Sequence, residues 1–142
     1  MGRRHEEYGE MAPRVRHHPA SGEVDLSAPA AELHRLARAV AEGAGLLWTT
    51  TGSDGDDGTL AGVEIRDTPG PGVRVAVDPA RRVLLIGGDG DARALFAANL
   101  RAMADADDGG HLHVDHFPDH PYLAEGSLPL VVNSPHGGMP GR

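Results

Sequence analysis

The chain has 142 residues and a mass of 14.8 kDa, which fits one domain with a core built mainly from Val, Leu, Ile and Ala. It contains no cysteine and no lysine, which excludes disulfides, thiolate metal sites, cysteine nucleophiles and lysine-based catalysis. Its formal net charge of -8 makes nucleic acid a poor partner, because phosphates would be repelled, and makes a basic protein a favourable one.

The two ends of the chain differ in composition from its middle. Residues 1–21 mix arginine with glutamate and show no apolar periodicity, which predicts a disordered N-terminal tail. Residues 134–142 predict a disordered C-terminal tail, so the single domain should span residues 22–133. No apolar run reaches the length of a membrane span, and the N-terminus lacks the apolar core of a signal peptide. We therefore expect a cytoplasmic protein.

The folded part begins with a short alternating strand at residues 23–26 and a helix over residues 29–42. Ser27 and Pro29 are typical of a helix start, as a capping residue followed by an early proline. Gly43 supplies the end of the helix. One apolar stripe of helical spacing supports this prediction: Leu33, Leu36, Ala37 and Val40.

Residues 45–51 are rich in strand formers, and they precede a glycine-rich acidic loop at residues 52–58. We expect Trp48, the only tryptophan, to be a packing residue. The acidic residues of the loop are Asp54, Asp56 and Asp57. Their spacing does not match an EF-hand calcium loop, and no flanking helices are expected.

Three further strands and a second helix follow. Residues 61–65 and 73–77 alternate apolar with polar side chains, which indicates an antiparallel meander with one wet face. Residues 83–86 are apolar on both faces and should lie centrally in a sheet. A helix is expected over residues 90–104, with an apolar side made by Ala92, Leu95, Phe96 and Met103.

The glycine-rich turn before this second helix could suggest a phosphate-binding loop. It has neither the G-x-G-x-x-G nor the G-K-[ST] pattern, and Asp89 and Asp91 place negative charge where a phosphate would sit. We expect these two carboxylates to cap the helix and complement its dipole.

The most specific stretch is His111-Leu112-His113-Val114-Asp115-His116. As a strand it places His111, His113 and Asp115 on one face. Its letters resemble the H-x-H-x-D-H signature of metallo-beta-lactamase-like hydrolases, in which two metals activate water. That resemblance covers six residues, and the chain is too short downstream to supply the other ligands of that fold. A small zinc site built from His111, His113 and either His120 or Asp115 stays an alternative to a plain wet strand face.

Residues 117–123 form a proline-bounded loop that contains Phe117 and Tyr122, and residues 127–132 predict a final strand. Pro129 has no N–H to donate to a sheet, so this strand should be an edge strand or begin as one.

A second resemblance covers much more of the chain. The order of elements from Gly22 to Asn133, with three short motifs, is similar to the immunity protein 32 family of bacterial polymorphic-toxin systems. The motifs are Asn99-Leu100-Arg101-Ala102-Met103-Ala104, His111-Leu112-His113-Val114-Asp115 with Phe117, and Ser127-Leu128-Pro129-Leu130-Val131. The resemblance implies an α+β domain that binds and neutralises a cognate toxin. It provides no catalytic residues to transfer to this chain, and we expect no cofactor.

These observations favour one α+β domain of order β-α-β-β-β-α-β-β, with two helices on one face of a largely antiparallel sheet. Its expected partner is a toxin protein, possibly basic, and the chain itself should be a monomer or small homo-oligomer, with neither nucleic acid nor membrane as a partner. The alternative hypothesis is a small metal-dependent hydrolase using the His-x-His-x-Asp strand face. The residues expected at the toxin interface are His111, His113, Asp115, Phe117, Tyr122, Asp54, Asp56 and Asp57.

Overall fold

A computed structural model describes residues 14–18, 20–49, 58–105, 111–115 and 120–133 of the chain. Within them lie two helices and eight strands, which confirms the α+β class. In chain order these are β1 (Arg14–His17), β2 (Val24–Ser27), α2 (Ala30–Glu42), β3 (Ala44–Trp48), β4 (Gly62–Asp67), β5 (Arg74–Asp78), β6 (Val83–Gly88), α3 (Gly90–Asp105), β7 (His111–Val114) and β8 (Leu130–Asn133).

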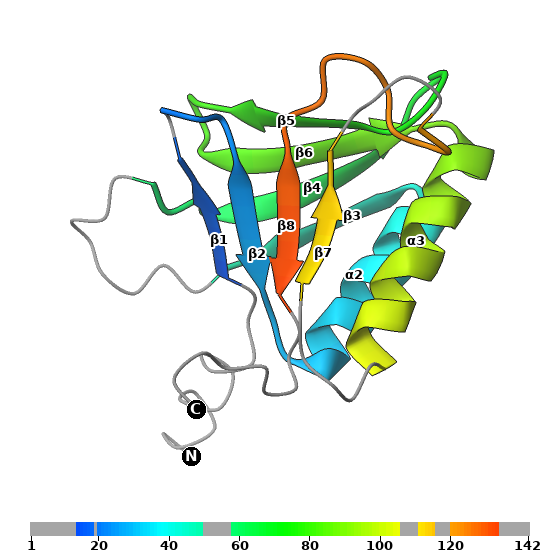
Figure 1. The fold of residues 1–142 in the computed structure, drawn as a ribbon, viewed down its shortest axis with the longest axis horizontal. Helices are drawn as coiled ribbons and strands as arrows, with labels where there is room; N and C mark the ends of the chain where they lie inside the picture. The colour runs from blue at the N-terminus through cyan, green and yellow to red at the C-terminus, as the bar shows by residue number, and fades with distance from the viewer. Residues whose placement is uncertain (1–13, 19, 50–57, 106–110, 116–119, 134–142) are drawn as a thin grey trace.

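The strands form two four-stranded sheets in place of the single sheet expected. The first sheet has the order β1-β2-β8-β7 and the second has the order β3-β4-β6-β5. Each sheet is mixed, because β2 pairs parallel with β8 and β4 pairs parallel with β6. In Figure 1 the first sheet and both helices lie on the same side of the second sheet. The buried side chains of both sheets and both helices form one hydrophobic cluster between these layers.

Two predictions about strand order were wrong. Strands β4, β5 and β6 do not form a meander, because β6 lies between β4 and β5. The apolar character of β6 on both faces did predict its central place. Strand β8 is also central, not an edge strand. Pro129 stands just before it and uses only its carbonyl, which accepts a hydrogen bond from the Val24 N–H at 2.8 Å.

Strand β1 lies inside the segment that was expected to be a disordered tail. Its four residues pair antiparallel with β2, and Val15 is buried in the core. A single apolar residue between two arginines shows no periodicity, so no strand could be predicted here.

Helix α2 follows the predicted stripe closely, but its start differs from the expectation. Leu33, Leu36 and Val40 are buried, and Gly43 ends the helix in the left-handed conformation. No side chain caps the first turn, because Pro29 occupies the N-cap position. Ser27 belongs to β2 instead, and its hydroxyl accepts a hydrogen bond from the Asn133 amide.

Helix α3 packs closely against α2, and Asp89 caps its first turn as predicted. The carboxylate of Asp89 accepts hydrogen bonds from the backbone N–H of Ala92 at 3.2 Å and of Gly72 at 2.7 Å. These bonds hold the pKa of Asp89 below its ordinary value, and the bond from Gly72 has the largest effect. Phe96 is buried as expected, whereas Leu95 is 48% exposed and does not belong to the packed side.

Arg93 takes a place on the packed side of α3, where it is only 5% exposed. Its guanidinium donates to the carbonyls of Val40 and Ala41, in the last turn of α2, at 2.8 and 2.9 Å. It also donates to the Gly88 carbonyl at 2.8 Å and to the Asp67 carboxylate at 2.9 Å. One buried side chain thereby joins the end of α2, the end of β6 and the start of α3.

Candidate functional site

The outer face of the first sheet carries two of the residues that the sequence singled out. Alternation along β7 buries Val114 and exposes His113, and Asp115 directly after the strand is also exposed. The predicted face of the strand is therefore confirmed for these two residues. His111 belongs to the same strand, but its side chain lies outside what the structure describes.

Pairing with β8 and β2 places further polar groups beside His113. The register aligns His113 with Val131 of β8, and Val131 in turn with Asp25 of β2. The Asp25 carboxylate lies 2.7 Å from Nε2 of His18, and on its other side β1 contributes Arg16. We call this surface the polar face; its residues are Arg14, Arg16, His18, Glu23, Asp25, His113 and Asp115.

A hollow of about 380 Å³ opens at one end of the polar face. Its lining residues are Ser21, Glu23, His113, Asp115, Ser127 and Pro129. Glu23 and Asp115 give this hollow two carboxylates beside one imidazole, so its acidic character suits a basic group of a partner. The residues that meet here are separated by about ninety positions in sequence, and the pairing of β8 with β2 on one side and with β7 on the other brings them together.

The residues of the metal alternative are not gathered into one described group. Among the described residues, no set of three His, Asp or Glu side chains is arranged to hold a metal ion. His120 lines a different hollow from His113. Its Nδ1 accepts hydrogen bonds from the backbone N–H groups of Tyr122 and Leu123, at 3.1 and 3.0 Å, so it shapes the turn that precedes β8.

Tyr122 is part of the core, although it was expected at the interface. It is 5% exposed, its ring stacks on Phe96 with the centroids 5.5 Å apart, and its hydroxyl accepts a hydrogen bond from Asn99. Burial raises the pKa of its phenol above the ordinary value. Phe117 and the acidic residues Asp54, Asp56 and Asp57 lie outside the described residues.

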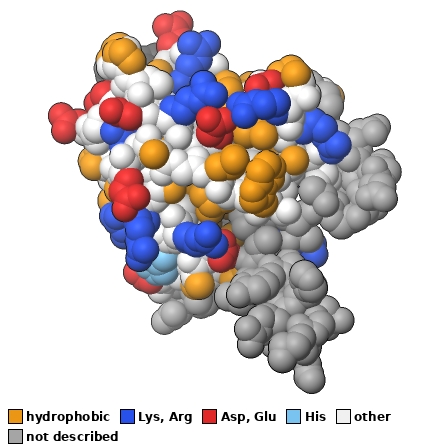
Figure 2. Space-filling model, turned by 180° about the vertical axis from the view of Figure 1, so that it is seen from behind, with side chains coloured by type: hydrophobic (Ala, Val, Ile, Leu, Met, Phe, Trp, Pro, Cys, Tyr) orange, Lys and Arg blue, Asp and Glu red, His pale blue; other side chains and the backbone are white. Residues whose placement is uncertain are grey.

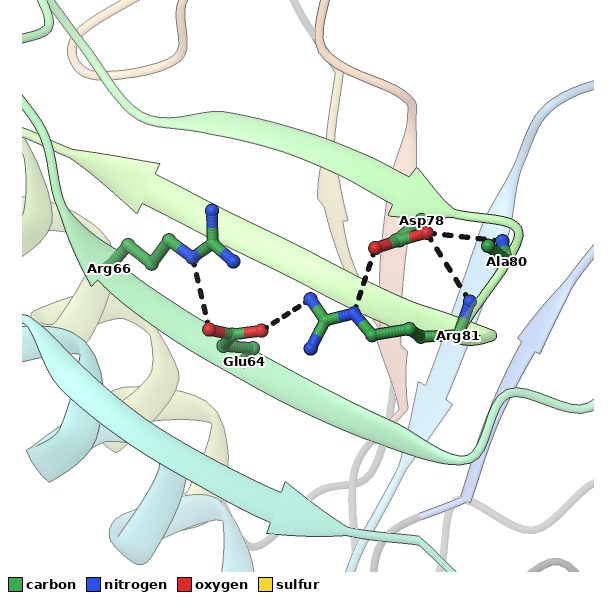
Figure 3. A network of polar contacts seen from close by, with 5 residues as sticks. All are labelled: Glu64, Arg66, Asp78, Ala80 and Arg81. Carbon is green, nitrogen blue, oxygen red and sulfur yellow. Dashed lines mark hydrogen bonds and ion pairs between the residues drawn. The ribbon is translucent and has the colours of Figure 1, made fainter.

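The second sheet has a solvent-facing side of different character. Glu64 stands between Arg66, at 3.0 Å, and Arg81, at 2.7 Å, and Arg81 also contacts Asp78 at 2.9 Å (Figure 3). The hydrogen bonds from Arg66 and Arg81 lower the pKa of Glu64, and those from Arg81 lower the pKa of Asp78. These carboxylates are thus already neutralised by the chain's own arginines.

Beside this ion-pair network lies Trp48, the most exposed large apolar side chain among the described residues. Trp48 is 64% exposed, so the prediction that it is a packing residue was wrong, and Leu46 on the same strand is 45% exposed. Figure 2 shows the molecule from this side, with apolar side chains gathered near arginines and carboxylates. Sequence reasoning missed this surface, because a run of strand formers does not show which strand lies at the edge of a sheet.

The described surface thus has two faces of different character, one polar and one partly apolar. Neither described helix has the length and apolarity needed to cross a membrane.

Comparison of the sequence with known protein families gives a match. Residues 83–135 match the model of the family Immunity protein 32, which confirms the resemblance predicted from the motifs. The match runs from β6 through α3 and β7 to the end of β8, and so includes His113 and Asp115 of the polar face. No curated protein and no solved structure matches the chain.

Proposed function

We propose that this chain is an immunity protein that binds a cognate bacterial toxin and neutralises it stoichiometrically, without catalysis. The observation that carries the proposal is the match of residues 83–135 to the immunity protein 32 family. The matched segment supplies β7 and β8, which are half of the first sheet; His113 lies in β7 and Asp115 directly follows it.

We infer that the polar face contacts the toxin. Its carboxylates at Glu23 and Asp115 are solvent-facing and line one hollow with His113. The net charge of -8 favours a basic partner, since opposite charge speeds association and complementary charges fix its register. His111, Phe117 and the acidic residues Asp54, Asp56 and Asp57 are proposed to extend this contact. Tyr122, being buried, would act by supporting the loop behind it.

Charge reversal at the hollow tests this assignment. Asp115→Arg should weaken binding of the toxin encoded beside this gene by at least about tenfold, because a buried interfacial charge of the wrong sign costs more than 1.4 kcal/mol. Glu42→Arg is the matched control, since Glu42 is an exposed carboxylate at the end of α2, away from the first sheet. Binding measured by calorimetry should be unchanged in the control. Equal weakening by both variants would show a general charge effect and no defined site.

Metal-dependent hydrolysis remains the second hypothesis, because His113 and Asp115 do line one hollow. It predicts about one equivalent of bound zinc or a similar ion in protein purified without an affinity tag. Under this hypothesis His113→Ala would remove both the metal and any hydrolytic activity. Under the immunity proposal His113→Ala changes only toxin binding.

A further inference from the structure

Strand β3 is exposed in a way that packing among the described residues does not explain. It lies at the edge of the second sheet and, among the described strands, pairs only with β4. Four of its five residues are exposed, and Leu47 alone is buried. Leu46 and Trp48 are two residues apart and therefore project from the same, outer face.

The tryptophan is held against the sheet and not against the core. A Cβ built on Gly62, its cross-strand neighbour, would lie 3.3 Å from the indole ring, so the ring rests over the glycine. The residue nevertheless remains 64% exposed. Exposed apolar groups of this size on an edge strand mark a contact surface.

The charges around β3 select the partner. The carboxylates of Glu64 and Asp78 are engaged by Arg66 and Arg81, and Arg74 also stands on the outer face of this sheet. This face therefore has no spare negative charge to attract a basic toxin. A second copy of the chain meets a face whose carboxylates are already paired with arginines, in contrast to the acidic remainder of the molecule.

The sequence of β3 is also complementary to itself. If two copies of the strand pair antiparallel about Leu46, Ala44 of one lies opposite Trp48 of the other, so that the smallest side chain faces the largest. Arg66 lies on β4, where it pairs with Ala44 of β3. In the dimer its side chain would lie next to the indole of the second copy, where a cation–π contact is favourable.

From this combination we propose that two copies of the chain form a two-fold dimer through β3, with Leu46 and Trp48 of each copy at the interface. The proposal does not depend on toxin binding, which we place on the first sheet. A contact through one short strand per copy is expected to bury less than the roughly 1,200 Å² of stable complexes, so the dimer is a weak one that dissociates on dilution. The overall charge of -8 opposes self-association, so salt strengthens the dimer and weakens a complex with a basic toxin.

The single tryptophan provides a direct test. Sedimentation of the full chain over a dilution series should show a monomer–dimer equilibrium, and the emission of Trp48 should shift to the blue as the dimer forms. Trp48→Ala and Leu46→Lys should each weaken dimerisation by at least about tenfold. The lysine stands across from Glu64, so it is compatible with folding. Leu95→Ala, at an equally exposed leucine on α3, should leave the equilibrium unchanged.

Three results would overturn the proposal. One is a monomer at every concentration with red, concentration-independent emission. Another is blue emission that does not change on dilution, which would mean that the chain itself covers Trp48. The third is a monomer whose Trp48 emission shifts only when the toxin is added, which would assign β3 to the toxin and leave the proposed function intact.

Discussion

Replacing Arg93 by methionine should remove the main polar connection between the two helices. The side chain is 5% exposed and donates hydrogen bonds to the carbonyls of Val40, Ala41 and Gly88. Methionine keeps much of the volume but donates nothing, so three acceptors lose a charged donor. An acceptor left unsatisfied in a buried position costs about 1–3 kcal/mol, and part of this is recovered where the end of α2 reaches water. We expect a loss of about 3–5 kcal/mol in the free energy of unfolding.

The ion pair with Asp67 is expected to contribute little to this loss. The Asp67 side chain is 68% exposed, and pairs of that exposure are worth less than about 1 kcal/mol. Asp67→Asn is therefore the matched control, and Arg93→Lys, which keeps the charge but has a single nitrogen, should fall between the two. Urea unfolding followed by circular dichroism measures all three variants. The reasoning is refuted if Arg93→Met costs no more than Asp67→Asn.

Two other predictions concern pH. Asp89 has a lowered pKa in the folded state, so its contribution to stability is present above its ordinary value of 3.8 and is lost as the pH falls through the folded-state value. Asp89→Asn, which loses the charged acceptor for Gly72, should lower the melting temperature more at pH 7 than at pH 2; an equal difference at both would contradict this. Tyr122 has a raised pKa, so its contribution is present below 10.0 and is lost as the pH rises through the folded-state value. Tyr122→Phe should cost about 1 kcal/mol at pH 7, from the hydrogen bond with Asn99, and should flatten the alkaline fall in melting temperature; a fall as steep as in the parent chain would contradict the shift.

The local elements were predictable because their cause is local. Apolar residues at helical spacing, such as Leu33, Leu36 and Val40, predict a helix without knowledge of the rest of the fold. Gly43 likewise predicts where this helix ends. The alternation of His113 with Val114 likewise fixes which side chain faces water. Arg93 was missed, although it stands three and seven residues before Phe96 and Leu100 on the buried side of α3. Its spacing from these two residues indicates the buried side of the helix, whereas a charged side chain is ordinarily expected to be exposed.

Strand order was not predictable, because alternation specifies the faces of a strand and not its neighbours. Nothing in the sequence of β8 shows that β2, about a hundred residues earlier, pairs with it in parallel. The polar face depends on that pairing, since it brings Glu23 to the hollow beside Asp115. For the same reason the exposure of Trp48 follows from the edge position of β3, which only the assembled sheet reveals.

Titration of the purified chain with its proposed partner, a toxin sought in the neighbouring genes, tests the central claim most directly, because it measures both binding and neutralisation. The proposal predicts a saturable complex with one toxin per chain and a loss of toxin activity that follows its formation. Raising the salt concentration should weaken that complex. A toxin that retains full activity at saturating concentrations of the chain, with no complex detected, would contradict the assignment as an immunity protein.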